Sequence, residues 1–262
     1  MTTWVNKMKI PGMVSLVGAG PGDPELITVR GRDRLAAADV VIYDDLAGRA
    51  LLDYCKTGCR CLYVGKRCGQ HSVTQDRIIE LLLTHARVGR RVVRLKGGDP
   101  FIFGRGGEEL IALVREGIPC EIVPGVTAAA AAGAAAGVPL THREYSSAVV
   151  FLTGHENPGK PESTIDWAAY ARLRATLCIY MGARKLAGIA EQLTDGGLAI
   201  DTPVAIVSRA SRPDQEVKLL TLADLIRGAG GEIAAPALAI VGEVARVPAL
   251  ARELAASAAI AY

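Results

Sequence analysis

Aromatic side chains and net charge are both scarce in this sequence. Phe, Trp and Tyr make up 5% of the 262 residues, and the formal net charge is only +3 at pH 7. Proteins that hold single-stranded nucleic acid need aromatic side chains for base stacking, and nucleic-acid binders in general present a strongly basic face. The composition therefore predicts no nucleic-acid partner.

Long apolar segments are missing as well. The most continuous run of small apolar residues, Ala128–Ala136, is short and is interrupted by Gly133. A membrane-spanning helix needs about 20 apolar residues. The first twelve residues carry Lys7 and Lys9 but lack the apolar centre of a secretory signal. We expect a cytoplasmic protein without a membrane partner.

Cysteine and histidine lack the spacing of metal-binding motifs. Four of the six cysteines, Cys55, Cys59, Cys61 and Cys68, lie close together, but their spacings match neither paired C-x-x-C zinc motifs nor iron–sulfur sequences. Without an export signal, the cysteines are expected to be free thiols. The sequence predicts no metal, and a metal or redox role of these cysteines stays open as the less favoured alternative.

The sequence does contain a regular alternation of apolar strands and amphipathic helices. Strands are predicted in the first half at residues 13–17, 39–43, 91–95 and 120–123. Thr28 is predicted to cap the first helix, and Ser72–Gln75 has the pattern of a capping box before another. This spacing is typical of α/β units with a largely parallel sheet, in which ligands bind at the carboxyl ends of the strands.

The pattern restarts in the second half of the chain. Apolar strands are predicted there at residues 148–153, 176–180, 203–208 and 237–241, with an antiparallel strand at 215–220. The predicted fold class is α/β, with two α/β domains facing each other across a cleft. We place an N-terminal α/β domain at residues 11–125, a hinge helix and linker at 126–142, and a C-terminal α/β domain at 143–262.

Two glycine-rich turns follow predicted strands, and each carries a carboxylate. Gly18–Asp23 resembles a dinucleotide-binding loop, but Asp23 stands where the last glycine would be and Pro21 lacks an amide N–H. A carboxylate also argues against phosphate at Gly97–Asp99. A cationic or hydroxyl-rich ligand without phosphate suits both turns, and S-adenosylmethionine has this chemistry. Simple tight turns are the alternative.

Eight segments of the chain resemble the uroporphyrinogen-III C-methyltransferases, a branch of the tetrapyrrole methylases. They follow the order of that family and span nearly the whole chain. The longest and most specific, Arg94–Glu109, reads Arg-Leu-Lys-Gly-Gly-Asp-Pro-Phe-Ile-Phe-Gly-Arg-Gly-Gly-Glu-Glu. The others are Val17–Pro24, Val41–Asp44, Tyr63–Arg67, Val123–Ala128, Gly137–Arg143, Thr153–His155 and Tyr180–Gly182.

The resemblance implies a homodimer of two-domain subunits, with S-adenosylmethionine bound in the cleft between the domains. It implies methylation of uroporphyrinogen III, a small-molecule tetrapyrrole, at C2 and C7. The product would be precorrin-2, which feeds sirohaem or cobalamin biosynthesis. A sulfonium is already an activated methyl donor, so the reaction would need no metal and would leave S-adenosylhomocysteine.

The same matches assign residues to the cofactor site. Carried over by motif, the cofactor contacts are Pro21, Gly97, Gly98, Asp99, Ile102, Thr127, Ala128, Met181 and Ala210. One departure concerns Ala210. Many relatives have Glu-Asn-Gly-Thr where this chain has Ser208–Ser211, so that Ala210 occupies the glycine position and Arg209 could alter the rim of the site.

For catalysis, the resemblance points to Asp44 as proton acceptor and Lys66 as proton donor. A carboxylate at the end of a strand suits the removal of a proton from the methylated tetrapyrrole. A helix-capping role for Asp44 stays open, as does a solvated or anchoring role for Lys66. The neighbouring Asp45 is a second candidate for the acceptor.

The many carboxylates of uroporphyrinogen call for bidentate cations. Arg105 and Arg143 are the candidates, because both lie within strong motifs, and Glu108 is placed to orient Arg105 from one helical turn on. Ion pairs at the domain interface are the alternative. Arginine outnumbers lysine 22 to 8, which suits such a substrate but is equally explained by a GC-rich genome.

Two other functions stay open at this stage. One is a later precorrin or cobalt-precorrin C-methyltransferase, which would share the fold and the cofactor. The other, from a different class, is a non-catalytic S-adenosylmethionine-binding regulator. The full Gly-Arg-Gly-Gly-Glu-Glu run, Gly104–Glu109, favours the first methylation.

Overall fold

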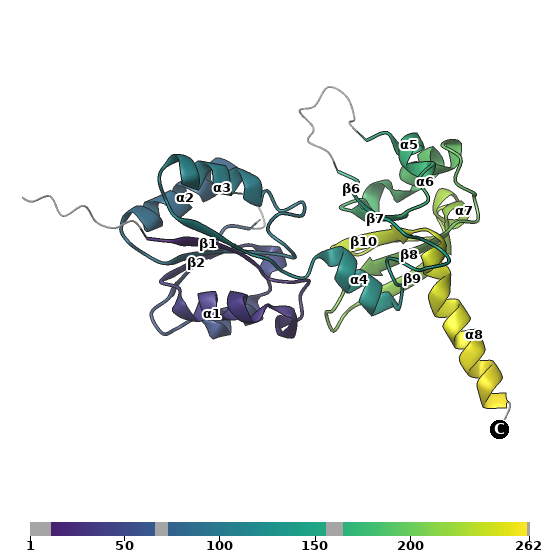
Figure 1. Ribbon diagram of the computed structural model, residues 1–262, viewed down its shortest axis with the longest axis horizontal. Coiled ribbons are helices and arrows are strands. Elements are labelled where there is room, and N and C mark those ends of the chain that lie inside the picture. The colour runs from purple at the N-terminus through teal and green to yellow at the C-terminus, as the bar shows by residue number, and fades with distance from the viewer. Residues whose placement is uncertain (1–11, 66–72, 156–164, 261–262) are drawn as a thin grey trace, which may run out of the picture. The chain divides into compact units, whose positions relative to one another are not determined.

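The chain folds into two compact units. The computed structural model describes residues 12–65, 73–155 and 165–260, and its units are Met1–Thr127 and Ala128–Tyr262 (Figure 1). Each unit contains one five-stranded sheet with helices. This architecture agrees with the predicted α/β class.

The first unit has a parallel sheet in the order β3-β2-β4-β1-β5. Its strands are β1 (Val14–Gly18), β2 (Val40–Tyr43), β3 (Arg60–Tyr63), β4 (Val92–Lys96) and β5 (Cys120–Val123). Its α-helices are α1 (Val29–Ala37), α2 (Gln75–Arg87) and α3 (Gly106–Arg115). The 3-10 helices among its described residues are η1 (Pro24–Leu26), η2 (Asp45–Ala47) and η3 (Arg49–Tyr54).

The central strands β1, β2 and β4 are buried because helices cover both faces of the sheet (Figure 1). Successive residues of a strand point to opposite faces. Ile42 of β2 accordingly packs in a cluster with Leu82 of α2 and Leu113 of α3. Its neighbour Val41 packs with Leu35 of α1 on the other face.

Threonine hydroxyls begin two of these helices. Thr28 accepts a hydrogen bond from the Gly31 N–H and caps α1 as predicted. Thr74 accepts one from the Arg77 N–H and caps α2. Within the predicted capping box the cap is therefore Thr74, and Ser72 lies outside the described residues.

Strand β3 has no counterpart in the sequence predictions. Its residues Arg60 and Cys61 are exposed, and Leu62 and Tyr63 are only half-buried. An edge strand of four residues with a polar start lacks the apolar run that marks the central strands. Its pairing with β2, from Val40 with Arg60 onward, is a tertiary feature.

The second unit has its own sheet in the order β6-β7-β10-β8-β9. Its strands are β6 (Val149–Thr153), β7 (Thr176–Tyr180), β8 (Pro203–Ser208), β9 (Glu216–Thr221) and β10 (Ala237–Val241). Its α-helices are α4 (Ala128–Ala136), α5 (Trp167–Ala171), α6 (Leu186–Asp195), α7 (Leu222–Ile226) and α8 (Val247–Ile260). Two 3-10 helices are η4 (Ala183–Lys185) and η5 (Glu243–Arg246).

The second sheet is mixed, unlike the parallel sheet of the first unit. Strands β6 and β7 are parallel, whereas β10 runs antiparallel to both β7 and β8. Strand β9 is antiparallel to β8, as predicted. The direction of β10 could not be predicted because a buried central strand is an apolar run in either orientation.

The segment expected as a hinge and linker, residues 126–142, contains helix α4. This helix packs against β8 and β10 of the second unit. The Tyr180 hydroxyl at the end of β7 accepts a hydrogen bond from the Ala129 N–H at 3.1 Å. Helix α4 is therefore part of the second unit, whose boundary falls between Thr127 and Ala128.

Among the described helices, none has the length and apolar character that crossing a bilayer requires.

Candidate functional site

Three loops of the first unit meet at the carboxyl ends of β1, β4 and β5. The loops after β1 and β4 are joined by backbone hydrogen bonds in both directions between Gly20 and Gly98, at 2.7 and 3.2 Å. The Ala19 N–H also donates to the Lys96 carbonyl at 2.7 Å. Because the strands are parallel, all these loops lie at the edge of the sheet where ligands bind in α/β proteins.

The loops lie so close together that only glycine fits at their contacts. A Cβ at Gly125, in the loop after β5, would lie 2.3 Å from the Gly98 carbonyl oxygen. A Cβ at Gly18 would lie 2.6 Å from the Gly125 Cα. We call Gly18, Gly98 and Gly125 the glycine contact. It fixes the backbone of the three loops against one another.

Asp99 connects two of these loops through its carboxylate. Oδ1 accepts a hydrogen bond from the Phe101 N–H at 2.8 Å, and Oδ2 accepts one from the Gly125 N–H at 3.0 Å. Oδ1 thus has its backbone partner in the same loop, and Oδ2 has its partner in the loop after β5. The Asp99 carboxylate therefore ties its own loop to the loop after β5.

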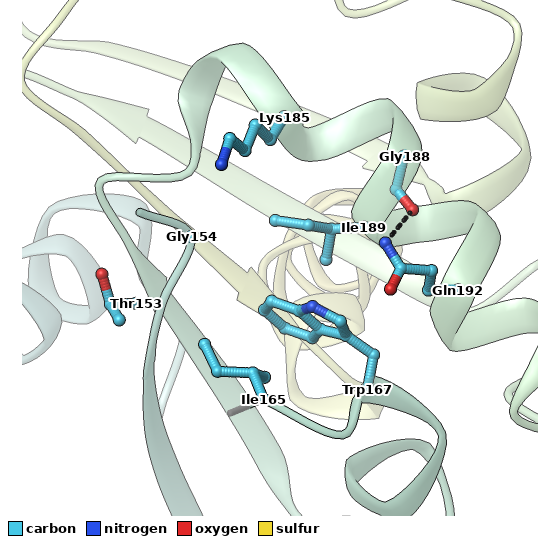
Figure 2. Close-up of a pocket in the computed structure, with 8 residues that line it drawn as sticks. All are labelled: Thr153, Gly154, Ile165, Trp167, Lys185, Gly188, Ile189 and Gln192. Atoms are coloured by element: carbon cyan, nitrogen blue, oxygen red, sulfur yellow. Dashed lines mark hydrogen bonds between the residues drawn. The ribbon is translucent and has the colours of Figure 1, made fainter. Parts of the chain in front are cut away.

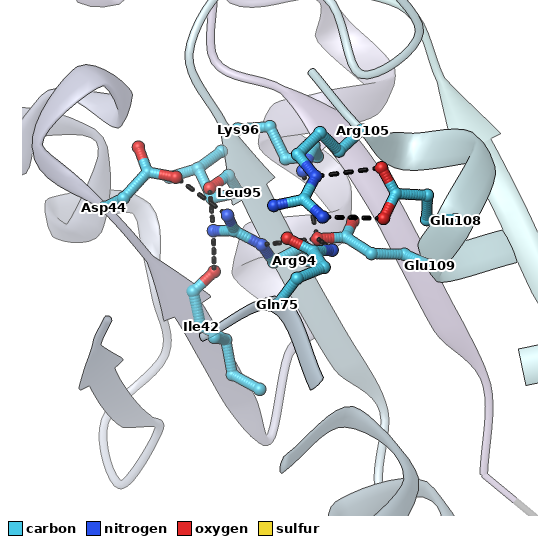
Figure 3. Close-up of polar contacts among 9 residues, drawn as sticks. All are labelled: Ile42, Asp44, Gln75, Arg94, Leu95, Lys96, Arg105, Glu108 and Glu109. Carbon is cyan, nitrogen blue, oxygen red and sulfur yellow. Dashed lines mark hydrogen bonds and ion pairs between the residues drawn. The ribbon is translucent and has the colours of Figure 1, made fainter. Parts of the chain in front are cut away.

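A buried ionic group lies next to the loops, under the carboxyl end of β4 (Figure 3). The Glu109 side chain of α3 is fully buried, and its Oε1 accepts hydrogen bonds from Lys96 at 3.0 Å, Gln75 at 3.1 Å and Arg94 at 3.3 Å. The Arg94 and Lys96 side chains are each 4% exposed. Burial lowers the pKa of Lys96, and the nearby Arg94 charge lowers it further, while Glu109 opposes the shift.

Asp44 is attached to this buried group. Its Oδ2 accepts a hydrogen bond from Nη2 of Arg94 at 2.8 Å, and its Oδ1 accepts one from the Leu46 N–H at 3.2 Å (Figure 3). Arg94 also donates to the carbonyls of Ile42 and Leu95, so its guanidinium is held from several sides. Asp44 therefore caps η2 and is also positioned by a buried cation.

Asp45, the alternative acceptor, has different partners. Its carboxylate accepts a hydrogen bond from the Tyr63 hydroxyl at the end of β3. The Asp45 side chain is exposed, whereas Asp44 is half-buried. The two neighbouring carboxylates therefore differ in burial and in partners, which the sequence alone did not show. Lys66, the expected proton donor, lies outside the described residues.

Arg105 and Glu108 are brought together as predicted, through two parallel hydrogen bonds. The Arg105 Nε donates to Oε1 at 2.8 Å and Nη2 donates to Oε2 at 2.7 Å (Figure 3). Both side chains are more than half exposed. The hydrogen bond with Glu108 raises the pKa of Arg105, and the same bond lowers the pKa of Glu108. Arg105 lies at the start of α3 in a left-handed conformation, with φ of 58°.

The remaining predicted contacts of the first unit lie on its loops. Pro21 is half-buried in the loop after β1. Ile102 is half-buried between the exposed Phe101 and Phe103, in the loop before α3. Thr127 is half-buried at the end of the first unit.

The other predicted contacts belong to the second unit. Ala128 begins α4, and Met181 follows β7 with φ of 54° and a side chain that is 54% exposed. Ala210 is half-buried in the turn after β8. Arg209 does not point freely from this turn, because it pairs with Asp214 and Glu216 of its own hairpin. Arg143 is exposed in a turn closed by His142 and Ser146.

A separate cavity of about 380 Å³ lies within the second unit (Figure 2). Trp167 and Ile189 form its apolar wall, and Lys185 lies at its edge. The other lining residues are Thr153, Gly154, Ile165, Gly188 and Gln192. It contains none of the predicted contacts, so it does not extend the candidate site.

The loop cluster fits S-adenosylmethionine better than a nucleoside phosphate. Asp23 and Asp99 place carboxylates in two of the loops, which disfavours phosphate. The glycine contact leaves no room for side chains there, so a ligand meets backbone groups. A cationic sulfonium and a ribose suit this surface.

Two α/β units with such a loop cluster define a ligand-binding α/β protein. The family model of the tetrapyrrole (corrin/porphyrin) methylases matches residues 13–226. The chain belongs to this family.

Three similar proteins illustrate the relationship. The chain is 52% identical over 233 residues to siroheme synthase 1 of Yersinia pseudotuberculosis, covering 89% of this chain but 49% of that protein. The chain thus spans about half the length of the siroheme synthases it matches. It is 49% identical over 234 residues to the S-adenosyl-L-methionine-dependent uroporphyrinogen III methyltransferase of Methanosarcina barkeri, covering 89% of this chain and 92% of that protein. The crystal structure of uroporphyrin-III C-methyl transferase from Thermus thermophilus complexed with S-adenyl homocysteine is similar with a TM-score of 0.78 and 42% identity, covering 90% of this chain and all of that one.

The buried ionic group generates a prediction for two adjacent glutamates. Glu109→Gln removes the negative charge that compensates Arg94 and Lys96, so the free energy of unfolding should fall by about 3 kcal/mol. Glu108→Gln, the same change in an exposed pair, should cost less than about 1 kcal/mol. Chemical denaturation of both variants measures the difference, and equal losses would show that the buried group does not stabilise the first unit.

Proposed function

We propose that this chain transfers methyl groups from S-adenosylmethionine to C2 and C7 of uroporphyrinogen III and so forms precorrin-2. The observation that carries the proposal is the match, over nearly the full length of both chains, to the Methanosarcina barkeri methyltransferase. The loop cluster and the anchored Asp44 supply chemistry that this reaction requires. The product would enter sirohaem or cobalamin biosynthesis.

The cofactor supplies an electrophilic methyl group on a sulfonium, and no metal is needed for its transfer. Gly97, Gly98 and Asp99 would supply most of the polar contacts to it, Ile102 would cover the adenosine, and Pro21 would line the site. The remaining proposed contacts are Thr127, at the end of the first unit, and Ala128, Met181 and Ala210 of the second unit. Hydrogen bonds between the loops would limit the entropy lost when the cofactor binds.

The part of Asp44 is to accept the proton that the tetrapyrrole loses after its carbon has been methylated. Its carboxylate lies at the end of β2 and is held at Oδ2 by Arg94 and at Oδ1 by the Leu46 N–H. A base held from two directions keeps one orientation toward the substrate, which general base catalysis requires. Lys66 is the proposed proton donor.

Arg105 and Arg143 are the proposed partners of the substrate carboxylates. Glu108 occupies the Nε–Nη2 edge of the Arg105 guanidinium, so a substrate carboxylate would approach the other edge of the fork. Glu108 in this arrangement orients Arg105. Arg143 is exposed in its turn, so a substrate carboxylate would bind it without displacing a buried partner.

The proposal includes a cytoplasmic homodimer with neither nucleic acid nor membrane as partner. The family resemblance supports the dimer. The nearly balanced charge supports a small-molecule substrate rather than nucleic acid.

The reaction itself is tested by anaerobic incubation with uroporphyrinogen III and S-adenosylmethionine, followed by mass spectrometry of the tetrapyrrole. A gain of two methyl groups is expected. Binding of the cofactor without any gain in mass would refute the substrate, and later precorrins would be assayed next. Binding without turnover on any tetrapyrrole would favour a regulator.

Adjacent aspartates allow a matched test of the proton acceptor. Asp44→Asn should lower turnover by about 100-fold or more, because it removes the general base. Binding of S-adenosylhomocysteine, followed by calorimetry, should be nearly unchanged. Asp45→Asn, whose carboxylate contacts Tyr63 instead of Arg94, should retain far more activity. The reverse order of the two variants would transfer the role to Asp45.

Paired glycines test the loop cluster as the cofactor site. Gly125→Ala would place a Cβ 2.3 Å from the Gly98 carbonyl, so the loops must shift and S-adenosylhomocysteine should bind about tenfold or more weakly. Gly107→Ala is the control, because a Cβ there meets nothing within 4 Å. Calorimetric titration of both variants measures the effect. Unchanged binding in Gly125→Ala would place the cofactor elsewhere.

A further inference from the structure

Three cysteines of the first unit converge beside the edge strand β3. The Sγ atoms of Cys55, Cys59 and Cys61 all lie within 4.8 Å of one another. Cys55 and Cys59 are half-buried and Cys61 is exposed, and all three are free thiols. We call these residues the thiol cluster.

Local backbone geometry brings the three side chains together. Cys55 ends η3, where its N–H donates to the Leu52 carbonyl. A tight turn follows, in which the Cys59 N–H donates to the Lys56 carbonyl at 3.1 Å and Gly58 has φ of 82°. Cys59 directly precedes β3 and Cys61 is the second residue of that strand, and their Sγ atoms lie within 4.8 Å of each other.

The surroundings leave the sulfurs facing one another. Lys56 lies within the turn, but its ammonium group binds Asp39 at 2.5 Å and the Ala37 carbonyl at 3.3 Å. Cys55 and Cys59 pack against the apolar cluster on the α1 face of the sheet. Thiolates at this spacing repel each other, and a shared cation would remove that repulsion.

We propose that Cys55, Cys59 and Cys61 form a binding site for one Zn²⁺ ion, with solvent as the fourth ligand beside the exposed Cys61. Zinc prefers thiolate sulfur and a tetrahedral arrangement. Zn–S bonds of about 2.3 Å place the sulfurs of such a site roughly 3.8 Å apart, so the side chains need to approach by at most about 1 Å. Binding forms three Zn–S bonds and releases the three thiol protons to solvent.

The position of the site indicates what the ion does. The thiol cluster lies at the amino end of β3, whereas Asp44 and the glycine loops follow the carboxyl ends of their strands. In a parallel sheet these are opposite edges. The ion would therefore join the end of η3, the turn and the edge strand, and it would stabilise the first unit without entering the methyl-transfer chemistry.

Metal titration of the reduced, chelator-treated full chain tests this site. Cd²⁺, a spectroscopic substitute for zinc, should bind one equivalent with sulfur-to-metal charge-transfer absorption. Zn²⁺ should compete with it and should raise the melting temperature. Cys59→Ser should weaken binding by about 100-fold or more, since a lost ligand costs at least as much as a lost outer-shell partner.

Two further variants separate the site from general effects of cysteine replacement. Cys61→Ser, at an exposed position, should lose the ion while the fold, followed by circular dichroism, is retained. Cys120→Ser is the matched control, because Cys120 is a half-buried cysteine of β5 outside the thiol cluster, and it should bind metal as the parent does. Metal binding that survives in Cys59→Ser and Cys61→Ser would overturn the proposal. The proposal would also be overturned if the reduced chain bound no metal and the thiol cluster formed a disulfide on oxidation.

Discussion

The arrangement of the candidate site in the first unit depends on the buried carboxylate of Glu109. A charge with no exposed surface is costly unless opposite charges and hydrogen bonds surround it, and here Arg94, Lys96 and Gln75 meet it at a single oxygen. Arg94 and Lys96 alternate along the end of β4, and Glu109 projects from α3, so the ionic group ties the helix to the strand. Arg94 then extends to Asp44 at the end of β2. One buried charge thus sets the position of the helix, of the loop between strand and helix, and of the carboxylate proposed as the base.

Strand order and register bring the separate pieces of the site to one edge of the sheet. Gly18 of β1 pairs with Lys96 of β4, and Tyr43 of β2 pairs with Leu95. The residues that follow these strands therefore emerge side by side, although they lie more than 20 positions apart in the chain. The glycine contact then removes the space between the loops. The buried ionic group fixes the ends of the strands and α3, and the glycine contact fixes the loops that follow the strands.

Most central strands and the helix caps could be predicted from the sequence because apolar runs and capping side chains are local signals. The edge strand β3 and the direction of β10 depend on which strands lie beside them, and no local pattern records that. Asp44 and Asp99 were found by motif, but their partners were not. Glu109 appeared only as the end of a motif, since nothing in a sequence distinguishes its burial from the exposure of Glu108. The thiol cluster was set aside on spacing, because spacing cannot show that a turn folds Cys55 back onto Cys59.

Asp44 and Asp99 show why the partners of a carboxylate matter more than its place in a motif. Each oxygen of Asp99 accepts from a backbone N–H in the loops, so breaking either bond would disturb the loop that it shapes. Asp44 also has a partner at each oxygen, but one of them is the side chain of Arg94, which is held in place by other groups. A carboxylate oxygen has room for a second hydrogen bond. In the proposed function, Asp44 receives a proton while the hydrogen bond to Arg94 keeps it in place, and the Asp99 carboxylate holds two loops together. The proposed function thus assigns the proton transfer to one aspartate and the shape of the loops to the other, and the assignment rests on what each one contacts.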